Sequence, residues 1–188
     1  MSTPIKISVI GAGSAQFSLG LVKDICLTPS LAGSLINFMD IDADRLDMIH
    51  KMAVRYAKEL GANLRFESTT DRRTSLQDAD FVINTASANS HHHQRAVREL
   101  TAKYGYYYGG VKLGDFLNLR LMLDVARDIE KTCPNAWLIQ SGNPVYEGCT
   151  LMTRETSVKV CGLCHGHYGV YETVSYTHLD VYKRQLQG

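Results

Sequence analysis

Residues 5–14 read Ile-Lys-Ile-Ser-Val-Ile-Gly-Ala-Gly-Ser, an apolar run that ends in two closely spaced glycines. The run is typical of a buried strand, and a helical pattern follows it. Gly11 allows a tight turn, and Gly13 lets a pyrophosphate approach the N-terminus of that helix. Gln16 replaces the usual third glycine, so a plain strand–helix turn stays open as the alternative. The stretch predicts the first unit of a dinucleotide-binding fold, with Gly11, Gly13 and Ser14 as cofactor-binding residues.

Apolar runs and amphipathic stretches alternate along the rest of the chain, which is the pattern of βαβ units around a parallel sheet. After the first strand, further strands are expected at 35–39, 63–67, 80–85, 136–140 and 158–163. Helices are expected at 17–26, 43–60, 92–104 and 116–131, with Gly61 and Gly105 as stop signals. We therefore predict an α/β fold, a Rossmann-like doubly wound parallel sheet, over residues 1–173.

Composition narrows the classes of function. The chain has 188 residues and a net charge of +1, so it lacks the basic surplus of nucleic-acid or anionic-membrane binding. Its apolar runs are shorter than the roughly 20 residues that a membrane span needs. The N-terminus lacks a secretory signal pattern, so the expected location is the cytoplasm. An odd number of cysteines, five, favours thiols over a disulfide framework.

Asp40 directly follows the second predicted strand. A carboxylate at that point accepts hydrogen bonds from the adenine-ribose hydroxyls and repels a 2′-phosphate, which favours NAD over NADP. Asp42 competes for the same role. The alternative for Asp40 is a cap for the next helix.

Two further motifs follow predicted strands, at the sheet edge where ligands bind in open α/β folds. Asn143 precedes Pro144 and offers both a donor and an acceptor to a sugar or to nicotinamide, although Asn-Pro is also a common turn. Cys164 and His165 follow the last predicted strand and are good ligands for transition metals. Cys161 is three residues from Cys164, so in a strand the two would face opposite sides, which disfavours a shared site.

The last residues break the βαβ pattern. Residues 174–185 read Val-Ser-Tyr-Thr-His-Leu-Asp-Val-Tyr-Lys-Arg-Gln. Back-translated, they contain an inverted repeat whose halves match a transposon end used in sequencing libraries. We expect residues 174–188 to be translated adapter sequence and the gene to continue beyond about Thr173. The alternative is a native C-terminal strand.

Taken together, the motifs resemble glycoside hydrolase family 4, in the right order and over roughly residues 5–172. The resemblance rests on Ile-Gly-Ala-Gly-Ser at 10–14, Met-Asp-Ile-Asp at 39–42, Ala-Asp-Phe-Val-Ile-Asn-Thr at 79–85, Tyr-Gly-Tyr-Tyr at 104–107, Asn-Pro at 143–144 and Gly-Leu-Cys-His-Gly-His-Tyr-Gly-Val at 162–170. The Cys-His-Gly version is similar to the branch that acts on α-glucosides or α-glucuronides.

The resemblance implies hydrolysis of an α-glycoside with NAD and Mn²⁺ as cofactors. In that mechanism C3 of the sugar is oxidised, a base removes the C2 proton, the aglycone leaves by elimination, water adds and C3 is reduced again. Cys164 matches a metal ligand, His165 the leaving-group acid and Asn143 a sugar-binding residue. The resemblance also implies a homo-oligomer and a second, substrate-binding domain, missing here through truncation. We therefore expect this chain to bind NAD weakly and to hydrolyse nothing.

Some features leave the substrate and the class of reaction open. The stretch 108–116 is shorter than in α-glucosidase-type relatives, and Asp115 is a candidate replacement for a sugar-binding aspartate there. The run His91–His93 lies near a helix start, where adjacent histidines point in different directions, so we do not predict a metal site. Two alternatives remain: a lactate/malate-type NAD-dependent dehydrogenase, and a non-catalytic nucleotide-binding fragment. Net NADH production would favour the dehydrogenase.

Overall fold

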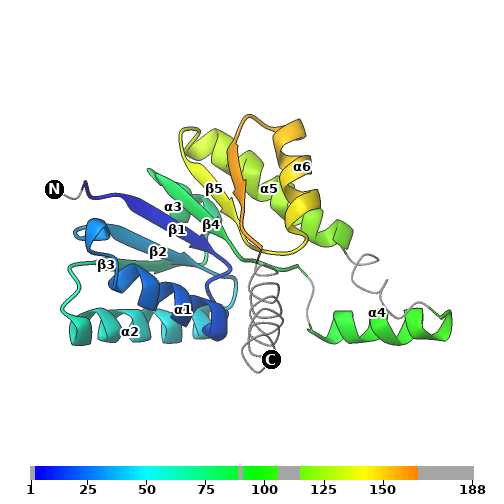
Figure 1. Cartoon of the computed structure of the whole chain (residues 1–188), viewed down its shortest axis with the longest axis horizontal. Helices are drawn as coiled ribbons and strands as arrows, with labels where there is room; N and C mark the ends of the chain where they lie inside the picture. The colour runs from blue at the N-terminus through cyan, green and yellow to red at the C-terminus, as the bar shows by residue number, and fades with distance from the viewer. Residues whose placement is uncertain (1–2, 89–90, 106–114, 165–188) are drawn as a thin grey trace, which may run out of the picture.

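The computed structural model of the chain describes residues 3–88, 91–105 and 115–164. Its centre is a six-stranded, wholly parallel sheet with the strand order β3-β2-β1-β4-β5-β6 (Figure 1). Because the order reverses between β1 and β4, the sheet is doubly wound, as predicted. The strands are β1 (Lys6–Ile10), β2 (Leu35–Met39), β3 (Arg65–Thr69), β4 (Phe81–Asn84), β5 (Trp137–Gln140) and β6 (Lys159–Gly162).

Helices connect the strands, and four of them were predicted from the sequence. The helices are α1 (Ala15–Cys26), α2 (Ala43–Leu60), α3 (Arg72–Leu76), α4 (His91–Lys103), α5 (Asp115–Thr132) and α6 (Val145–Glu155), with a short 3₁₀ helix η1 (Pro29–Leu31). The sequence pattern did not predict η1, α3 or α6. The parallel pairing of β5 and β6 requires a crossover such as α6, and its buried residues Val145, Gly148 and Met152 have helical spacing.

Strand β3 starts two residues later than predicted. It is an edge strand whose side chains are exposed or half-buried at every position, so apolar alternation does not fix its ends. Backbone hydrogen bonds to the turn before β2 define where β3 begins. The Arg65 N–H donates to the Ser34 carbonyl, while the Asn63 carbonyl accepts from the Gly33 N–H in the preceding turn.

Two apolar layers hold the helices against the sheet. One joins α1 and α2 to β1 and β2; it includes Val9, Val22, Ile36, Phe38, Leu46 and Ile49. The other joins α3, α5 and α6 to β4 and β5; it includes Leu76, Val82, Met122, Val125, Ile129, Leu138 and Met152. Figure 1 shows α1 and α2 on one side of the sheet and α5 and α6 on the other. Both faces of the parallel sheet therefore carry helices, as such sheets require.

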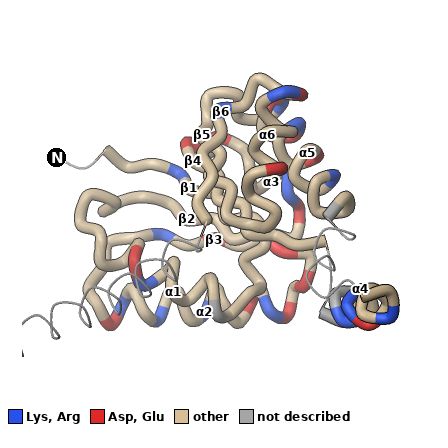
Figure 2. Tube along the Cα trace, turned by 45° about the vertical axis from the view of Figure 1, so that its right-hand side comes forward, with Lys and Arg blue, Asp and Glu red and all other residues tan. Residues whose placement is uncertain are grey.

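Helix α2 shows how local sequence sets an element. Asp42 caps its start by accepting from the Arg45 N–H at 3.1 Å, and Gly61 ends it with a φ of 65°. Its exposed face carries i,i+4 ion pairs such as Lys51–Asp47 and Arg55–Glu59, and Figure 2 shows both charge signs mixed along α2 and α4. Among the described residues, no helix combines the length and apolarity of a membrane span. The cytoplasmic location stays a prediction.

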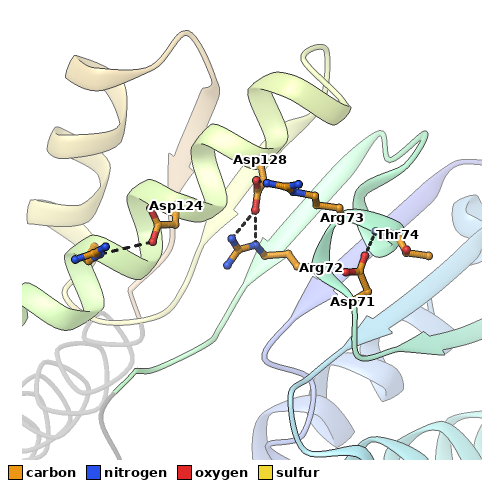
Figure 3. A network of polar contacts seen from close by, with 7 residues as sticks. Asp71, Arg72, Arg73, Thr74, Asp124 and Asp128 are labelled. Carbon is orange, nitrogen blue, oxygen red and sulfur yellow. Dashed lines mark hydrogen bonds and ion pairs between the residues drawn. The ribbon is translucent and has the colours of Figure 1, made fainter.

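Asp128 of α5 links the two halves of the sheet through α3 (Figure 3). Its carboxylate, 7% exposed, accepts from Arg72 Nε at 2.8 Å and Arg73 Nε at 3.3 Å, and Arg72 Nη2 also contacts it. Asp71 caps α3 by accepting from the Thr74 N–H at 2.6 Å, and this hydrogen bond holds the pKa of the Asp71 carboxyl below its usual value. The bridge holds the segment after β3 against the helix that packs on β4 and β5.

Candidate functional site

The carboxyl ends of the strands form one line across the sheet. In register, Met39 lies beside Ile10, Ile10 beside Asn84, Asn84 beside Gln140, and Gln140 beside Gly162. The predicted site residues that the structure describes lie one to four positions past this line; they are Gly11, Gly13, Ser14, Asp40, Asn143 and Cys164. The fold therefore gathers them along one edge. At about 4.8 Å per strand, the part of that edge that holds them extends roughly 19 Å from β2 to β6.

The glycine turn after β1 is held from three sides. Gly11 has a φ of 86°, its N–H donates to the Met39 carbonyl at 2.9 Å, and a Cβ there would lie 2.5 Å from the Ala86 nitrogen. The buried Ser18 hydroxyl donates to the Ala12 carbonyl at 2.6 Å. Only glycine fits at Gly11, because both the left-handed backbone and the loop after β4 exclude a side chain.

Asp40 joins this turn to the end of β2. Its Oδ2 accepts from the Gly13 N–H at 2.7 Å, and its Oδ1 accepts from the Asp42 N–H at 3.0 Å. A Cβ at Gly13 would lie 2.8 Å from Asp40 Oδ2, so the missing side chain makes room for the carboxylate. Asp42, not Asp40, caps α2, so the capping alternative for Asp40 is wrong. Each Asp40 oxygen keeps a further lone pair that can accept from a ribose hydroxyl.

Ser14 occupies the N-cap of α1. It is exposed, its side chain makes no capping hydrogen bond, and the first turn of α1 contains no acidic residue. The positive end of the helix dipole is therefore not offset by a carboxylate of its own turn. This arrangement, with Gly11 and Gly13 beside it, fits the pyrophosphate of a dinucleotide.

Sequence analysis did not assign a role to Asn84 and Gln140, the last residues of β4 and β5. Both side chains are 0% exposed, and Asn84 Nδ2 donates to Gln140 Oε1 at 2.9 Å. Thr85, next along, donates its hydroxyl to the carbonyls of Ile10 and Gly11 at 3.1 Å each. Each of the two apolar strands β4 and β5 ends in an amide residue. This pattern is visible in the sequence and could have identified the pair.

Asn143 and Cys164 lie further along the same edge. Asn143 is exposed in the turn between β5 and α6. Cys164 is exposed two positions past the end of β6, where the Leu163 N–H donates to the Gln140 carbonyl at 2.9 Å. His165, predicted as the catalytic acid, and the stretch 106–114 lie outside the described residues, as does the boundary predicted at residue 173. Their roles stay predictions.

The cysteines differ in their surroundings. Cys26, Cys133, Cys149 and Cys161 carry free thiols, as the odd count suggested. Burial raises the pKa of the Cys133 thiol to about 11, and burial also raises the pKa of Cys26 and Cys149. Within the described ranges, no three His, Cys, Asp or Glu side chains group into a metal site. Cys164 is therefore the one predicted metal ligand that the structure describes, and it does not complete a site.

Comparison with known proteins finds a family model and relatives that match this chain. A family model described as "Family 4 glycosyl hydrolase" matches residues 6–179. An α-galactosidase of Bacillus subtilis (strain 168) is 31% identical over 172 residues, which cover 85% of this chain and 39% of the relative. An α-glucosidase of Erwinia rhapontici is 33% identical over 172 residues, with 85% and 37% covered. The chain thus spans about two fifths of the length of these relatives.

Solved structures show the same fold. A 6-phospho-α-glucosidase from gut microorganisms, in complex with NAD and Mn²⁺, aligns with a TM-score of 0.75 at 22% identity, over 86% of this chain and 39% of that one. A lactate dehydrogenase from Eimeria maxima, with NADH and oxamate, aligns with a TM-score of 0.63 at 17% identity, over 87% and 44%. At these identities the likeness concerns the fold alone.

Proposed function

Because the chain belongs to family 4 of the glycosyl hydrolases, we propose that residues 1–173 form the NAD-binding domain of an enzyme that cleaves α-glucosides or α-glucuronides. The observation that supports this most is the alignment of the strand ends, which gathers the glycine turn, Asp40, Asn143 and Cys164 along one sheet edge. Ligands bind at this edge in doubly wound sheets.

The adenine half of NAD would lie over β1 and β2. The pyrophosphate would lie beside Ser14 at the start of α1, where the first turn carries no acid and where Gly11 and Gly13 carry no side chain to block its approach. Asp40 would accept from the adenine-ribose hydroxyls while its carboxylate keeps Gly13 in place at 2.7 Å. The same carboxylate would repel the 2′-phosphate of NADP. The preference for NAD therefore follows from Asp40.

The sugar would lie over β5 and β6. Bound NAD supplies a reversible oxidation at C3 of the sugar, which acidifies the neighbouring C2 proton. Asn143, exposed past β5, would bind a sugar hydroxyl. His165 would donate a proton to the leaving oxygen, since an unperturbed imidazole titrates near pH 6.5. Cys164 would contribute one ligand to Mn²⁺, and within the described ranges no group of His, Cys, Asp or Glu side chains completes that site.

An assay of the protein expressed from the complete reading frame tests the activity. We expect release of nitrophenol from a nitrophenyl α-glucoside or α-glucuronide, with dependence on both NAD and Mn²⁺. His165→Asn should slow cleavage of alkyl glycosides more than nitrophenyl glycosides, because nitrophenolate leaves without a proton. Full activity without NAD would exclude the proposal.

A lactate/malate-type dehydrogenase is the second candidate. Asn143 and Pro144, which follow β5, support it. A dehydrogenase would accumulate NADH in proportion to substrate consumed. The glycosidase would leave the NADH level unchanged while free sugar accumulates.

A further inference from the structure

The loops after β4 and β5 are fastened to each other through two buried amides. Asn84 Oδ1 accepts from the Ala86 N–H at 3.3 Å, and Asn84 Nδ2 donates to Gln140 Oε1 at 2.9 Å. Gln140 Nε2 donates in turn to the Gly142 carbonyl at 2.8 Å. The chain of hydrogen bonds therefore runs from one loop, through both side chains, to the other.

Backbone contacts tighten the same junction. The N–H groups of Ser141 and Gly142 both donate to the Asn84 carbonyl, at 3.0 and 2.9 Å. A Cβ at Gly142 would lie 3.0 Å from the Ala86 carbonyl oxygen and 3.2 Å from Gln140 Nε2. The two loops are thus in close contact, and these backbone hydrogen bonds join them in addition to the amide pair.

The loop after β4 is also anchored on its other sides. Thr85 binds the carbonyls of Ile10 and Gly11, and the Ala88 N–H donates to Asn118 Oδ1 of α5 at 2.8 Å. The β4 loop is thus fixed to the glycine turn and to α5. Asn84 and Gln140 connect this loop to Gly142 through their side-chain hydrogen bonds. Asn143 follows directly after the residue whose carbonyl Gln140 holds.

We propose that the Asn84–Gln140 amide pair positions the two loops that face the nicotinamide half of NAD, and thereby sets the placement of Asn143. This inference rests on the proposed NAD site. With the adenine half over β1 and β2, the other half must extend over β4 and β5, on the far side of the switch point. Asn84 and Gln140 are positioning residues, because both are fully buried and reach the ligand only through the loops.

A comparison of NAD with ADP-ribose, which lacks nicotinamide, tests the proposal on the 188-residue chain. NMR titration, which detects weak binding, should show that the wild type binds NAD more tightly than ADP-ribose. Gln140→Met keeps the volume but removes both hydrogen bonds. It should lower the affinity for NAD about tenfold and leave the affinity for ADP-ribose within about twofold. Gly142→Ala keeps both amide groups but crowds Gln140 Nε2 and the Ala86 carbonyl oxygen, so it should reduce the same preference for NAD.

Leu138→Ala is the matched control. Leu138 lies on the same strand and face as Gln140 and is 0% exposed, so its truncation destabilises the core without touching the loops. The control should keep the wild-type ratio of NAD to ADP-ribose affinity. A parallel loss of both ligands in Gln140→Met, or a wild type without preference for NAD, would overturn the inference and leave the nucleotide site standing. A wild type that binds neither ligand would overturn both proposals.

Discussion

Gly11 and Gly20 are both glycines, but only Gly11 lies where the backbone conformation and a neighbouring loop exclude a side chain. Gly11 has a φ of 86°, and an added Cβ would lie 2.5 Å from the Ala86 nitrogen. Gly20 lies within α1, where an added Cβ would meet nothing within 4 Å. Sequence analysis identified Gly11 from its place between a strand and a helix. The sequence does not reveal the contact with Ala86, because Ala86 follows β4 and is distant from Gly11 along the chain.

Alanine at these two glycines should have opposite effects on stability. Gly11→Ala should lower the free energy of unfolding by about 2–4 kcal/mol, from a positive φ and a steric overlap. Gly20→Ala should raise it by about 0.5–1 kcal/mol, because alanine loses less backbone entropy in a helix. Urea unfolding followed by circular dichroism measures both. Equal effects of the two substitutions would contradict the geometry of the turn.

The buried thiol of Cys133 should make the folded chain less stable at alkaline pH. Burial disfavours its thiolate and raises the pKa to about 11 in the folded chain, whereas an unfolded thiol ionises near pH 8.5. Its contribution to stability is therefore complete below about pH 8.5 and is lost as the pH rises toward 11. Urea midpoints at several pH values test this. The wild type should lose more stability between about pH 8.5 and 11 than Cys133→Ala. Identical pH profiles of the two proteins would refute the raised pKa of the Cys133 thiol.

At the scale of elements, length and periodicity decided which parts were predictable. The bounds of α2 agree with the prediction, because an apolar stripe runs through it and Gly61 ends it. Helix α3 has only five residues, so it presents too few positions for a periodic signal. The edge strand β3 has no fully buried side chain, and its predicted start was two residues early. Tertiary contacts, not local pattern, define these elements.

The link between α3 and α5 is testable with two aspartates of one helix. Asp128→Asn should lower the free energy of unfolding by about 2–3 kcal/mol, because it leaves Arg72, half-buried, and Arg73 without their shared carboxylate. Asp124 forms an exposed pair with Arg120 one helical turn earlier, at 3.9 Å. Asp124→Asn should therefore change stability by less than about 0.5 kcal/mol. Thermal unfolding of both variants gives the comparison; similar losses would mean that the bridge does not stabilise the fold.

At the scale of the whole molecule, the sequence predicted the architecture and the sheet edge at which the described candidate residues lie. The strand order and the gathering of Gly11, Asp40, Asn143 and Cys164 follow from topology, which alternating patterns already indicate. The Asn84–Gln140 pair depends on the register between β4 and β5, which composition alone does not give. The homo-oligomer, the second domain and the tail at 174–188 stay predictions.

Trp137 reports on one face of the sheet. It is the only tryptophan, it lies on β5, and it is 46% exposed, although a parallel sheet usually has both faces covered. Acrylamide should therefore quench its fluorescence in the native chain, to an extent between that of a buried indole and that of the chain in urea. Native emission that is fully protected from acrylamide would show that this face is covered in solution.

The most direct test of the account is a residue-resolved NMR titration of the 188-residue chain with NAD, which detects weak binding. We predict saturable shifts centred on the amides of Gly11–Ser14 and Asp40, with a second group at Gly142 and Asn143. NADP should produce smaller shifts, and Asp40→Ala should reduce that difference. Shifts centred away from the carboxyl edge of the sheet, or none at the highest soluble NAD concentration, would contradict the assignment of this chain as an NAD-binding domain.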